Sequence, residues 1–583
     1  MSTDDHPGAD VANPYTLQRD DGDARHVFWA DAVADHIERR EPSEPIVIKG
    51  GISVSGVPHL GNVNEIMRGY FVAQVLRERG YAVRQVFTAD DRDPLRTLPR
   101  TLCDLDGNLV DLGDVDAGAL GRNLGVPYTD IPDPFGCCDS YGDHFARIIQ
   151  DSADAAGVPI DLVSTTDLYT DGDFDEVTRF LLSNRTQARR VLANYQETVD
   201  AEGEYVPFNP ICGECGKLTE TVTDVDLDAG DGGTVDYECT ALTAGEQTID
   251  GCGHTGTASI RAGKLPWRFE WPAQWQVLGV DFEPFGKDHA EGSWPSGEDI
   301  ARTVLGIDPP VPMVYEWFTL DGEAFSSSAG NVILLSEVLE LVELEVVHYF
   351  FAKDPSKARD FSVDRLDQLV DEFDRFERLY FEEATPADED SAAFADRVYP
   401  LVVEPTLARV FDTEGPTETV PAPARFEGRI RLPYTFAAVL GMTDDRDLRE
   451  EIARKEGHIP EDAPEWAVDH ALARVERARN WARRTGNEFD YELARTTLPA
   501  HEFDDATSAA LDELADYVAE RDPDPEALQG EIYETAKRHD VPVGDFFGAG
   551  YRLFFDQEQG PKLGPFLAKL DREFVIERLR RER

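Results

Sequence analysis

The sequence predicts a Rossmann-like, doubly wound α/β domain with a zinc-ribbon-like insertion, followed by an all-α C-terminal domain. Three observations carry this prediction. A short β-branched strand at 46–51 turns through glycines into a helix at 59–80, and a second strand follows at 82–89. Four cysteines in a metal-ligand spacing lie between 212 and 252. From 430 onward the chain has the apolar periodicity of helices.

The parts follow one another along the chain, and 583 residues are enough for several domains. The apolar positions between the serine-rich loop near 326 and residue 385 are spaced as in amphipathic helices. Acidic, proline-bearing stretches at 385–392 and 413–425 are typical of linkers. The predicted parts are an acidic tail at 1–25, the α/β domain at 26–330 with its insertion at 101–265 and a cysteine module at 205–260, connecting helices at 331–385, and a helical domain at 386–583.

The turn between the first strand and its helix reads Pro58-His59-Leu60-Gly61-Asn62. A strand, a glycine turn and a helix N-terminus together make an anion site, because backbone N–H groups and the helix dipole face the ligand. The alternative is a histidine that only caps the helix. The second strand ends at Asp90-Asp91, and ligands of doubly wound sheets bind at such carboxyl ends.

A second segment, Thr319 to Asn331, is a small polar loop that leads into an apolar stretch. Together the two segments resemble the HIGH and KMSKS signatures of class I aminoacyl-tRNA synthetases, and the closer resemblance is to class I lysyl-tRNA synthetase. The resemblance runs nearly from end to end, with its motifs in the expected order. The matching segments are Gly51 to Asn62, Asp133 to Tyr141, Phe285-Gly286-Lys287-Asp288-His289, Phe325 to Asn331, Tyr349 to Ala352 and Gly560 to Leu567.

The resemblance implies a class I catalytic domain, a helical connecting domain and an anticodon-binding helical domain. It also implies ATP-dependent formation of lysyl-adenylate with Mg²⁺, followed by transfer of lysine to tRNA(Lys). Positioning and charge stabilisation dominate such chemistry. The residues implied for catalysis are His59, Asn62, Ser326, Ser327 and Ser328, and those implied for ATP binding are these five with Pro58, Gly61, Asp288, Gly330 and Asn331.

By the same resemblance, the amino-acid pocket is lined by Gly51, Ser53, Trp267, His289 and Tyr315. An aromatic face suits an ammonium group, with about 0.5–2 kcal/mol of cation–π attraction. The alternative for the two aromatic residues is core packing, and three tryptophans fall between 264 and 275. Asp90 and Asp91 are possible carboxylate partners of the ammonium group.

The loop departs from the family pattern, because alanine stands at Ala324 and Ala329 where the family has lysine. One such donor to developing charge is typically worth about 3 kcal/mol. Lys49, Lys287, an arginine or Mg²⁺ could replace these cations, or the activation rate could be low. A third alternative is a non-catalytic paralogue.

Cys212-x-x-Cys215, Cys239 and Cys252-Gly253-His254 have a zinc-ribbon spacing. Four protein ligands would make a closed structural Zn²⁺ site, and we favour Cys252 over His254 as the fourth ligand. The alternative is reduced thiols without metal. The adjacent Cys137 and Cys138 are expected at the rim of the active site.

For tRNA contact, Arg474, Arg477, Trp481 and Arg484 fall on one face of a predicted helix. Arginine with an aromatic residue suits backbone contact and base stacking. A solvated face paired with nearby glutamates is the alternative.

The net charge of −59 is extreme for a chain expected to bind nucleic acid. Only ten residues are lysine, and an acid-rich, lysine-poor composition is typical of proteins from halophilic archaea. At about 1 M salt the Debye length is roughly 3 Å, so acidic residues no longer repel at range. The charge therefore indicates habitat.

An odd count of seven cysteines indicates a reducing cytoplasm, and no stretch predicts a signal peptide or membrane span. Three other functions stay open on the sequence alone. They are another class I synthetase, most plausibly glutamyl-like, a non-catalytic tRNA-binding paralogue, and a nucleotidyltransferase that does not use tRNA.

Overall fold

The computed structural model describes residues 26–230, 232–244, 247–325, 330–410, 427–521 and 523–582. These residues form two compact units. The first unit holds 26–338, 347–362 and 385–410, and the second holds the rest of the described residues. The units interleave in sequence, so neither corresponds to one continuous segment of the chain.

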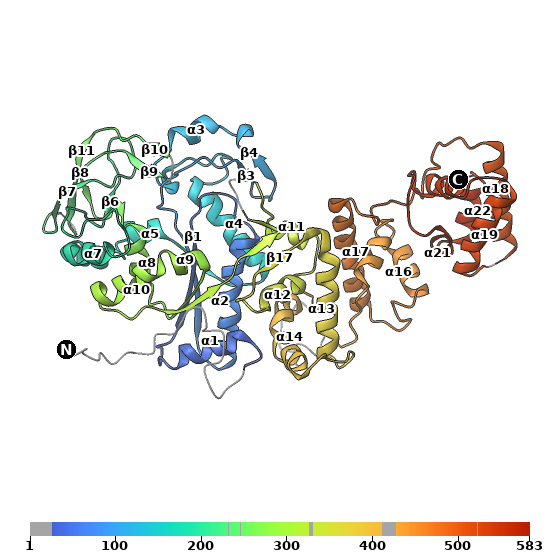
Figure 1. The fold of residues 1–583 in the computed structure, drawn as a ribbon, viewed down its shortest axis with the longest axis horizontal. Coiled ribbons are helices and arrows are strands. Elements are labelled where there is room, and N and C mark those ends of the chain that lie inside the picture. The colour runs from blue at the N-terminus through green and yellow to red at the C-terminus, as the bar shows by residue number, and fades with distance from the viewer. Residues whose placement is uncertain are drawn as a thin grey trace. The chain divides into compact units, whose positions relative to one another are not determined.

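A five-stranded parallel sheet forms the centre of the first unit (Figure 1). The strand order is β14-β13-β1-β2-β5, and every neighbouring pair is parallel. The sheet is doubly wound, as predicted from the sequence. Strands β2 and β5 are added on one side of β1, and β13 and β14 are added on the other side. The strands are β1 (Ile46–Ile52), β2 (Val83–Ala89), β5 (Asp161–Ser164), β13 (Phe282–Gly286) and β14 (Val311–Tyr315).

Both faces of the sheet are covered, as the near-continuous burial of its central strands requires. On one face Ile48 meets Gly69 of helix α2 (Leu60–Glu78), which packs on β1 and β2 beside α1 (Trp29–Glu38). On the other face Val47 belongs to a cluster with the tryptophans of α8 (Trp267–Leu278) and Trp294 of α10 (Trp294–Asp299). Two of the three tryptophans of α8 are therefore core residues, as the sequence allowed.

The insertion contributes short helices and small antiparallel sheets. Two of these helices, α6 (Asp175–Ser183) and α7 (Arg185–Leu192), follow each other directly and are separated at Asn184. The cysteine module contains a sheet in the order β11-β8-β7. The other elements of this region are β3 (Thr101–Cys103), β4 (Leu109–Asp111), α3 (Ala117–Arg122), α4 (Tyr141–Ala156), α5 (Thr165–Thr170), β6 (Asn209–Pro210), β7 (Val222–Asp226), β8 (Thr234–Glu238), β9 (Leu242–Ala244), β10 (Gln247–Ile249), β11 (Thr255–Ser259) and β12 (Gly263–Lys264).

After the central sheet, β15 (Phe318–Leu320) pairs with β16 (Glu323–Ala324) and with β17 (Arg359–Phe361). Helices α11 (Leu335–Leu339) and α12 (Leu344–Ala352) lie between these strands in sequence. The stretch predicted as a linker at 385–392 contains the start of α14 (Glu389–Val410), so that part of the prediction is wrong. The other predicted linker, 413–425, and the tail at 1–25 lie entirely outside the described residues.

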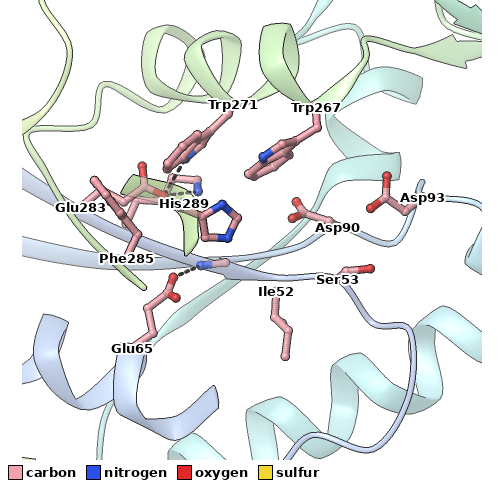
Figure 2. Close-up of a pocket in the computed structure, with 12 residues that line it drawn as sticks. Ile52, Ser53, Glu65, Asp90, Asp93, Trp267, Trp271, Glu283, Phe285 and His289 are labelled. Atoms are coloured by element: carbon pink, nitrogen blue, oxygen red, sulfur yellow. Dashed lines mark hydrogen bonds and ion pairs between the residues drawn. The ribbon is translucent and has the colours of Figure 1, made fainter. Parts of the chain in front are cut away.

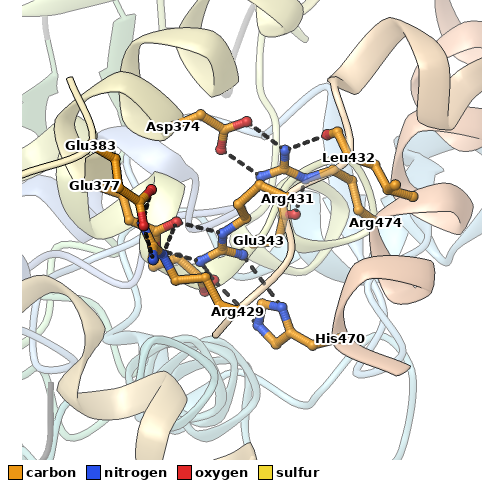
Figure 3. Close-up of polar contacts among 10 residues, drawn as sticks. Glu343, Asp374, Glu377, Glu383, Arg429, Arg431, Leu432, His470 and Arg474 are labelled. Carbon is orange, nitrogen blue, oxygen red and sulfur yellow. Dashed lines mark hydrogen bonds and ion pairs between the residues drawn. The ribbon is translucent and has the colours of Figure 1, made fainter. Parts of the chain in front are cut away.

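The second unit is all helical within the described residues, as predicted. Arg474, on α17, is almost completely buried and donates to Asp374 at 2.7 and 2.8 Å and to Glu343 at 2.5 Å (Figure 3). The helices are α13 (Leu366–Tyr380), α15 (Tyr434–Leu440), α16 (Arg446–Lys455), α17 (Glu465–Thr485), α18 (Asp505–Glu520), α19 (Pro525–Arg538), α20 (Val543–Phe555), α21 (Leu563–Leu567) and α22 (Arg572–Leu579).

Candidate active site

His59 and Asn62 cap the N-terminus of α2 with two hydrogen bonds. The Nδ1 atom of His59 accepts from Gly61 N at 3.1 Å, and Asn62 Oδ1 accepts from His59 N at 2.9 Å. This is a capping box with histidine and asparagine in the two reciprocal positions. A Cβ atom at Gly61 would lie 2.8 Å from the His59 ring, so glycine is required by the histidine itself.

The first backbone N–H groups of α2 are already used, which differs from the open anion site expected from the sequence. Leu60 N donates to Ile333 O at 2.9 Å, and Asn62 N donates to His59 O at 2.8 Å. Because Nδ1 accepts a hydrogen bond, a neutral His59 ring carries its proton on Nε2. Burial lowers the pKa of His59 to about 4, so the ring is neutral near pH 7. The N–H group at this turn that the cap leaves unused is therefore His59 Nε2–H.

Phe325, the first residue of the F-S-S-S-A-G-N segment, stacks on His59 with ring centroids 4.9 Å apart and an interplanar angle of 23°. Ser326, Ser327, Ser328 and Ala329 lie outside the described residues. The loop is closed at its base by Asn331, whose Nδ2 donates to Ala324 O at 2.9 Å. Gly330 has φ +81°, which a side chain rarely adopts. The two signature segments thus meet in space at His59 and Phe325.

A pocket of about 260 Å³ opens at the carboxyl ends of β1 and β2 (Figure 2). Four of the five residues predicted for the amino acid line it: Gly51, Ser53, Trp267 and His289. The fifth, Tyr315, lies behind the lining and donates its hydroxyl to Glu65 Oε2 at 3.0 Å. The remaining lining residues are Lys49, Ile52, Glu65, Asp90, Asp93, Trp271, Glu283 and Phe285.

The aromatic wall of the pocket is held from behind. Trp267 stacks on Trp271 with centroids 5.3 Å apart, and His289 lies 5.4 Å from Trp271. The Trp271 indole donates to Glu283 Oε1 at 2.9 Å, and Trp275 donates to Glu283 Oε2 at 2.5 Å. Glu283 also accepts from Lys49 Nζ at 2.7 Å. Each oxygen of the Glu283 carboxylate therefore accepts a hydrogen bond. These bonds hold the Trp271 and Trp275 rings in place.

Adjacent residues at the end of β2 have different surroundings. Asp90 lines the pocket, whereas Asp91 accepts from Thr165 Oγ1 at 3.1 Å and from Thr166 N at 2.8 Å outside the lining. Burial raises the pKa of both carboxyl groups. Of the two possible partners named from the sequence, only Asp90 can reach a ligand in the pocket.

The sequence analysis missed Glu65, which lies on α2 between the strand and the Tyr315 hydroxyl. Its Oε1 accepts from Gly51 N at 2.7 Å. Burial raises the pKa of Glu65 to about 7. A carboxyl group six residues after the histidine, on the sheet-facing side of the helix, was the signal that could have identified it.

Lys49 and Lys287 are the two lysines among the cations that could replace the absent loop lysines. Lys49 is buried in its pair with Glu283. Lys287 is partly exposed and lies 3.2 Å from Glu316 Oε1. Asp288 follows Lys287 at the end of β13, and its carboxylate closely approaches Gly286, where a Cβ atom would lie 2.8 Å from Oδ1.

The four predicted metal ligands converge. The Sγ atoms of Cys212, Cys215, Cys239 and Cys252 all lie within 4.8 Å of one another. The Cys212–Cys252 and Cys215–Cys239 sulfur distances are both 3.6 Å. Tetrahedral zinc with Zn–S bonds of 2.3 Å separates its sulfurs by about 3.8 Å, so the set fits Zn²⁺. The group that could hold a metal includes Cys252 and not His254.

A second group of potential ligands comprises Asp133, Cys137, Cys138 and His144, whose ligand atoms also lie within 4.8 Å of one another. Cys137 Sγ lies 3.3 Å from His144 Nδ1, and His144 Nε2 lies 2.9 Å from Cys103 O. Nearby, Tyr141 donates to Ser55 O at 2.9 Å, next to the turn that leads to α2. From the sequence these two cysteines were expected only at the rim of the active site, so the group with Asp133 and His144 was missed.

The four residues of the helix face predicted to contact tRNA differ in their exposure to solvent. Arg474 and Trp481 are buried at 1% and 3% exposure, and Trp481 Nε1 donates to Val363 O at 2.8 Å. Arg477 donates to Leu339 O at 3.2 Å, and Arg484 is exposed. Two of the four side chains, Arg474 and Trp481, therefore pack inside the second unit.

No helix of the described residues is long and apolar enough to cross a membrane.

Comparison with known proteins agrees with this geometry. A family profile described as "tRNA synthetases class I (K)" matches residues 27–401. A lysine--tRNA ligase of Halobacterium salinarum is 68% identical over 99% of this chain and 100% of its own length. That of Haloarcula marismortui is 65% identical over 98% and 99%, and that of Pyrococcus horikoshii is 33% identical over 95% and 100%. The chain therefore belongs to the class I lysyl-tRNA synthetases.

Proposed function

We propose that this chain activates L-lysine with ATP and transfers the lysyl group to tRNA(Lys). The observation that carries the proposal is the pocket at the carboxyl ends of β1 and β2, because it joins an aromatic wall to carboxyl groups beside the capped N-terminus of α2. An aromatic wall with nearby carboxylates suits the methylene stem and the charge of lysine.

In this proposal lysine lies among Gly51, Ser53, Trp267 and His289, with Tyr315 behind them. The His59 Nε2–H group donates to an ATP phosphate. Gly61 N holds the ring in that orientation, and Asn62 holds the His59 backbone N–H through the reciprocal cap. Pro58, Gly61, Asp288, Gly330 and Asn331 complete the nucleotide site together with the three serines of the loop. Mg²⁺ would neutralise the phosphates, where the family's loop lysines are absent.

We further propose that the four-cysteine group holds a structural Zn²⁺. The supporting observations are the sulfur spacing and the absence of an open coordination position once four thiolates are bound. The ion would join the two cysteine pairs of the module at 205–260, next to the hydrophobic cluster that contains Cys212 and Cys239. It would take no part in the chemistry.

We also propose that 331–385 acts as the connecting domain and that the helices of 386–583 include the anticodon-binding region. For tRNA contact, Arg477 and Arg484 are the two members of the predicted face that reach the surface of the second unit. The full-length similarity to proteins named lysine--tRNA ligase supports these assignments through family membership.

The test is amino-acid-dependent exchange of pyrophosphate into ATP in molar KCl, with each of the twenty amino acids, with and without tRNA. Exchange with lysine is the expected result. Exchange with another amino acid, such as glutamate, would place the specificity elsewhere in class I. No exchange from folded protein under any condition would favour the non-catalytic paralogue that Ala324 and Ala329 suggested.

A further inference from the structure

One segment of the insertion carries no negative charge, although the chain is strongly acidic. Residues 177–196 contain no aspartate or glutamate, whereas 115 of the 583 residues of the chain are acidic. The two other segments of about this length without an acidic residue are 45–64 and 251–269, and both contribute residues to the pocket. The segment 177–196 lies outside that pocket, so the pocket does not explain its composition.

The same segment is rich in arginine. It contains Arg179, Arg185, Arg189 and Arg190. The last three lie on α7, which therefore carries three positive charges in its eight residues and no negative one. A helix of this composition attracts a polyanion.

The arginines of α7 have few acidic partners within the protein. Arg185 donates to Leu182 O at 3.0 Å, and Arg189 donates to a backbone carbonyl at 2.9 Å. Neither forms an ion pair with a carboxylate of the described residues. Arg190 pairs with Glu202 at 3.2 Å, but these side chains are 58% and 74% exposed, so water and other anions compete for the contact. Guanidinium N–H groups are therefore available to an external ligand.

Exposed aromatic rings flank the arginine helix in sequence. Phe180, on α6, is 43% exposed, and Tyr195, which follows α7, is 38% exposed. They are two of the five large apolar side chains that the described residues expose. The Tyr195 hydroxyl donates to Asp299 Oδ2 at 3.1 Å, which restrains the ring. Arginine beside exposed aromatic rings suits RNA, because it offers contacts to phosphates and to bases or riboses.

The helices that carry this surface pack behind the aromatic wall of the pocket. Leu181 and Leu192 belong to one hydrophobic cluster with Phe269 of α8, and the same helix presents Trp267 and Trp271 to the pocket. Figure 1 shows α7 beside α8 and α10. Strand β5 runs parallel to β2 and leads directly into α5, so the chain enters this group of helices from the edge of the sheet where the pocket opens.

We propose that Arg185, Arg190, Phe180 and Tyr195 form a surface that binds the sugar-phosphate backbone of the acceptor arm of tRNA. The inference rests on the proposed function, in which the 3′ end of tRNA(Lys) enters the pocket. Guanidinium groups donate pairs of hydrogen bonds to phosphate oxygens. A carboxylate in this segment would face those phosphates, which accounts for the absence of acidic residues from 177–196 in an otherwise acidic chain.

The test is the double variant Arg185→Gln/Arg190→Gln, measured in the molar KCl in which the wild type is folded. Glutamine keeps a polar side chain and removes the charge. We expect the KM for tRNA in aminoacylation to rise by about tenfold. The slope of log Kd for tRNA against log KCl concentration should become shallower by about 1.4–1.8, at about 0.7–0.9 for each lost phosphate contact. The KM values for lysine and ATP at saturating tRNA should stay unchanged, because neither arginine lines the pocket.

The matched control is Arg39→Gln/Arg84→Gln, which removes the same charge from exposed positions of the same unit. Arg39 follows α1 shortly before β1 begins, and Arg84 pairs with Asp161 at 2.6 Å near the start of β2. Both positions belong to the edge of the sheet opposite to the pocket. This control should keep the KM for tRNA and the salt slope of the wild type. An equal loss in the control would mean that tRNA affinity follows the net charge of the chain, and would overturn the proposal.

Ethylation of tRNA phosphates shows which of them the protein needs. Interference with binding is expected at phosphates of the acceptor arm in the wild type, and it should disappear at those positions in Arg185→Gln/Arg190→Gln. Interference confined to the anticodon arm, or the same pattern in both proteins, overturns the proposal.

The outcomes separate this inference from the proposed function. A wild type that neither exchanges pyrophosphate with lysine nor charges tRNA contradicts the proposed function itself. A wild type that charges tRNA, beside a folded double variant with unchanged KM and salt slope, overturns the role of this surface alone. Circular dichroism shows whether the double variant folds. If it does not, Arg190→Gln alone, at a side chain that is 58% exposed, should change the slope by about half as much.

Discussion

At the scale of single residues, the histidine of the first signature caps its helix and, in the proposed function, also binds ATP. The sequence allowed either a helix cap or a phosphate ligand. In the structure Nδ1 caps the helix, and this bond fixes the proton on Nε2, which is left as the donor. The cap is therefore compatible with the phosphate contact proposed for this ring, because it uses Nδ1 and leaves Nε2–H.

The pKa of Glu65 predicts how lysine binding responds to pH. Burial raises this pKa to about 7, with Lys49 acting to lower it and Glu283 to raise it. Below pH 7 Glu65 is protonated, so the pocket proposed for lysine loses a negative charge that would attract the cationic amino acid. We expect the KM for lysine to increase as the pH falls from 8 to 6, with little change in the KM for ATP.

The matched control is Glu65→Gln, in which the same pH series should be much flatter. The comparison is needed because Asp90, His289 and Tyr315 also face the pocket or Glu65. Equal pH dependence in both proteins would assign the titration to one of those groups. The pH also affects folding, in the direction opposite to that of a carboxyl group whose pKa is lowered. Because folding raises the pKa of Glu65, the free energy of unfolding decreases as the pH rises from 4.5 toward 7.

The sequence could predict the lining of the pocket better than its charges. Trp267, His289 and Ser53 carry recognisable motifs, and all three line the pocket. Asp90 and Asp91 could not be told apart, because only the end of β2 in three dimensions shows which carboxylate turns inward. Glu65 belongs to no motif, and its role depends on contacts with β1 and β14, which lie far from each other in sequence.

At the scale of elements, the cap of α2 is a unit that can be tested by Asn62→Ala. This change removes the acceptor for His59 N and half of the reciprocal box. We expect a loss of about 1 kcal/mol in the free energy of unfolding, measured by chemical denaturation. Activation should fall further than this value explains, because the backbone N–H of His59 loses the side chain that holds the residue in place. Asn62→Asp, which keeps an acceptor at the same position, should retain the stability. Unchanged stability in Asn62→Ala would show that the cap is dispensable.

The cysteine module gives a prediction about metal. Cys239→Ser should lower the zinc content, measured by plasma mass spectrometry, by one ion per chain, and should expose the module to proteolysis. Cys103→Ala removes a buried thiol that belongs to neither ligand group and should not change the zinc content. Equal zinc in the wild type and in Cys239→Ser would contradict the assignment.

Helix α17 shows why a basic face in sequence need not be an RNA surface. Arg474 is buried between Glu343 and Asp374, and it donates to Leu432 O at 2.7 Å. Arg474→Met would leave two buried carboxylates without their cation, at a cost of about 3–5 kcal/mol. We expect a large fall in the denaturation midpoint for Arg474→Met and almost none for Arg484→Met, which changes an exposed residue.

The same pair of variants separates folding from tRNA binding. Arg484→Met should weaken tRNA binding without a change in stability, if the exposed part of the face contacts RNA. A stable Arg474→Met variant would show that the buried network shown in Figure 3 contributes little.

At the scale of the whole molecule, local sequence patterns predicted whether each part is helical or α/β. They did not predict which parts of the chain pack together. Strand and helix periodicity identified β1, α2 and β2 within a few residues of their observed bounds. The interleaving of the two compact units could not be read from the sequence, because α14 belongs to the first unit through long-range contacts. Arg397 on this helix pairs with Asp31 at 2.9 Å, and nothing in the local sequence indicates that partner.

The composition predicts how the stability of the whole chain depends on salt. With 115 acidic and 56 basic residues, the folded protein carries a net charge of −59, and compaction brings these like charges together. Raising KCl from 0.1 M to 1 M shortens the Debye length from about 10 Å to about 3 Å and screens that repulsion. We expect the melting temperature, followed by circular dichroism, to rise steeply over this range. NaCl at equal ionic strength should act similarly, whereas an equal concentration of uncharged sucrose should act much less, because screening requires ions. A rise of the same size in sucrose would mean that solvent exclusion from the protein surface, rather than charge repulsion, sets the salt requirement.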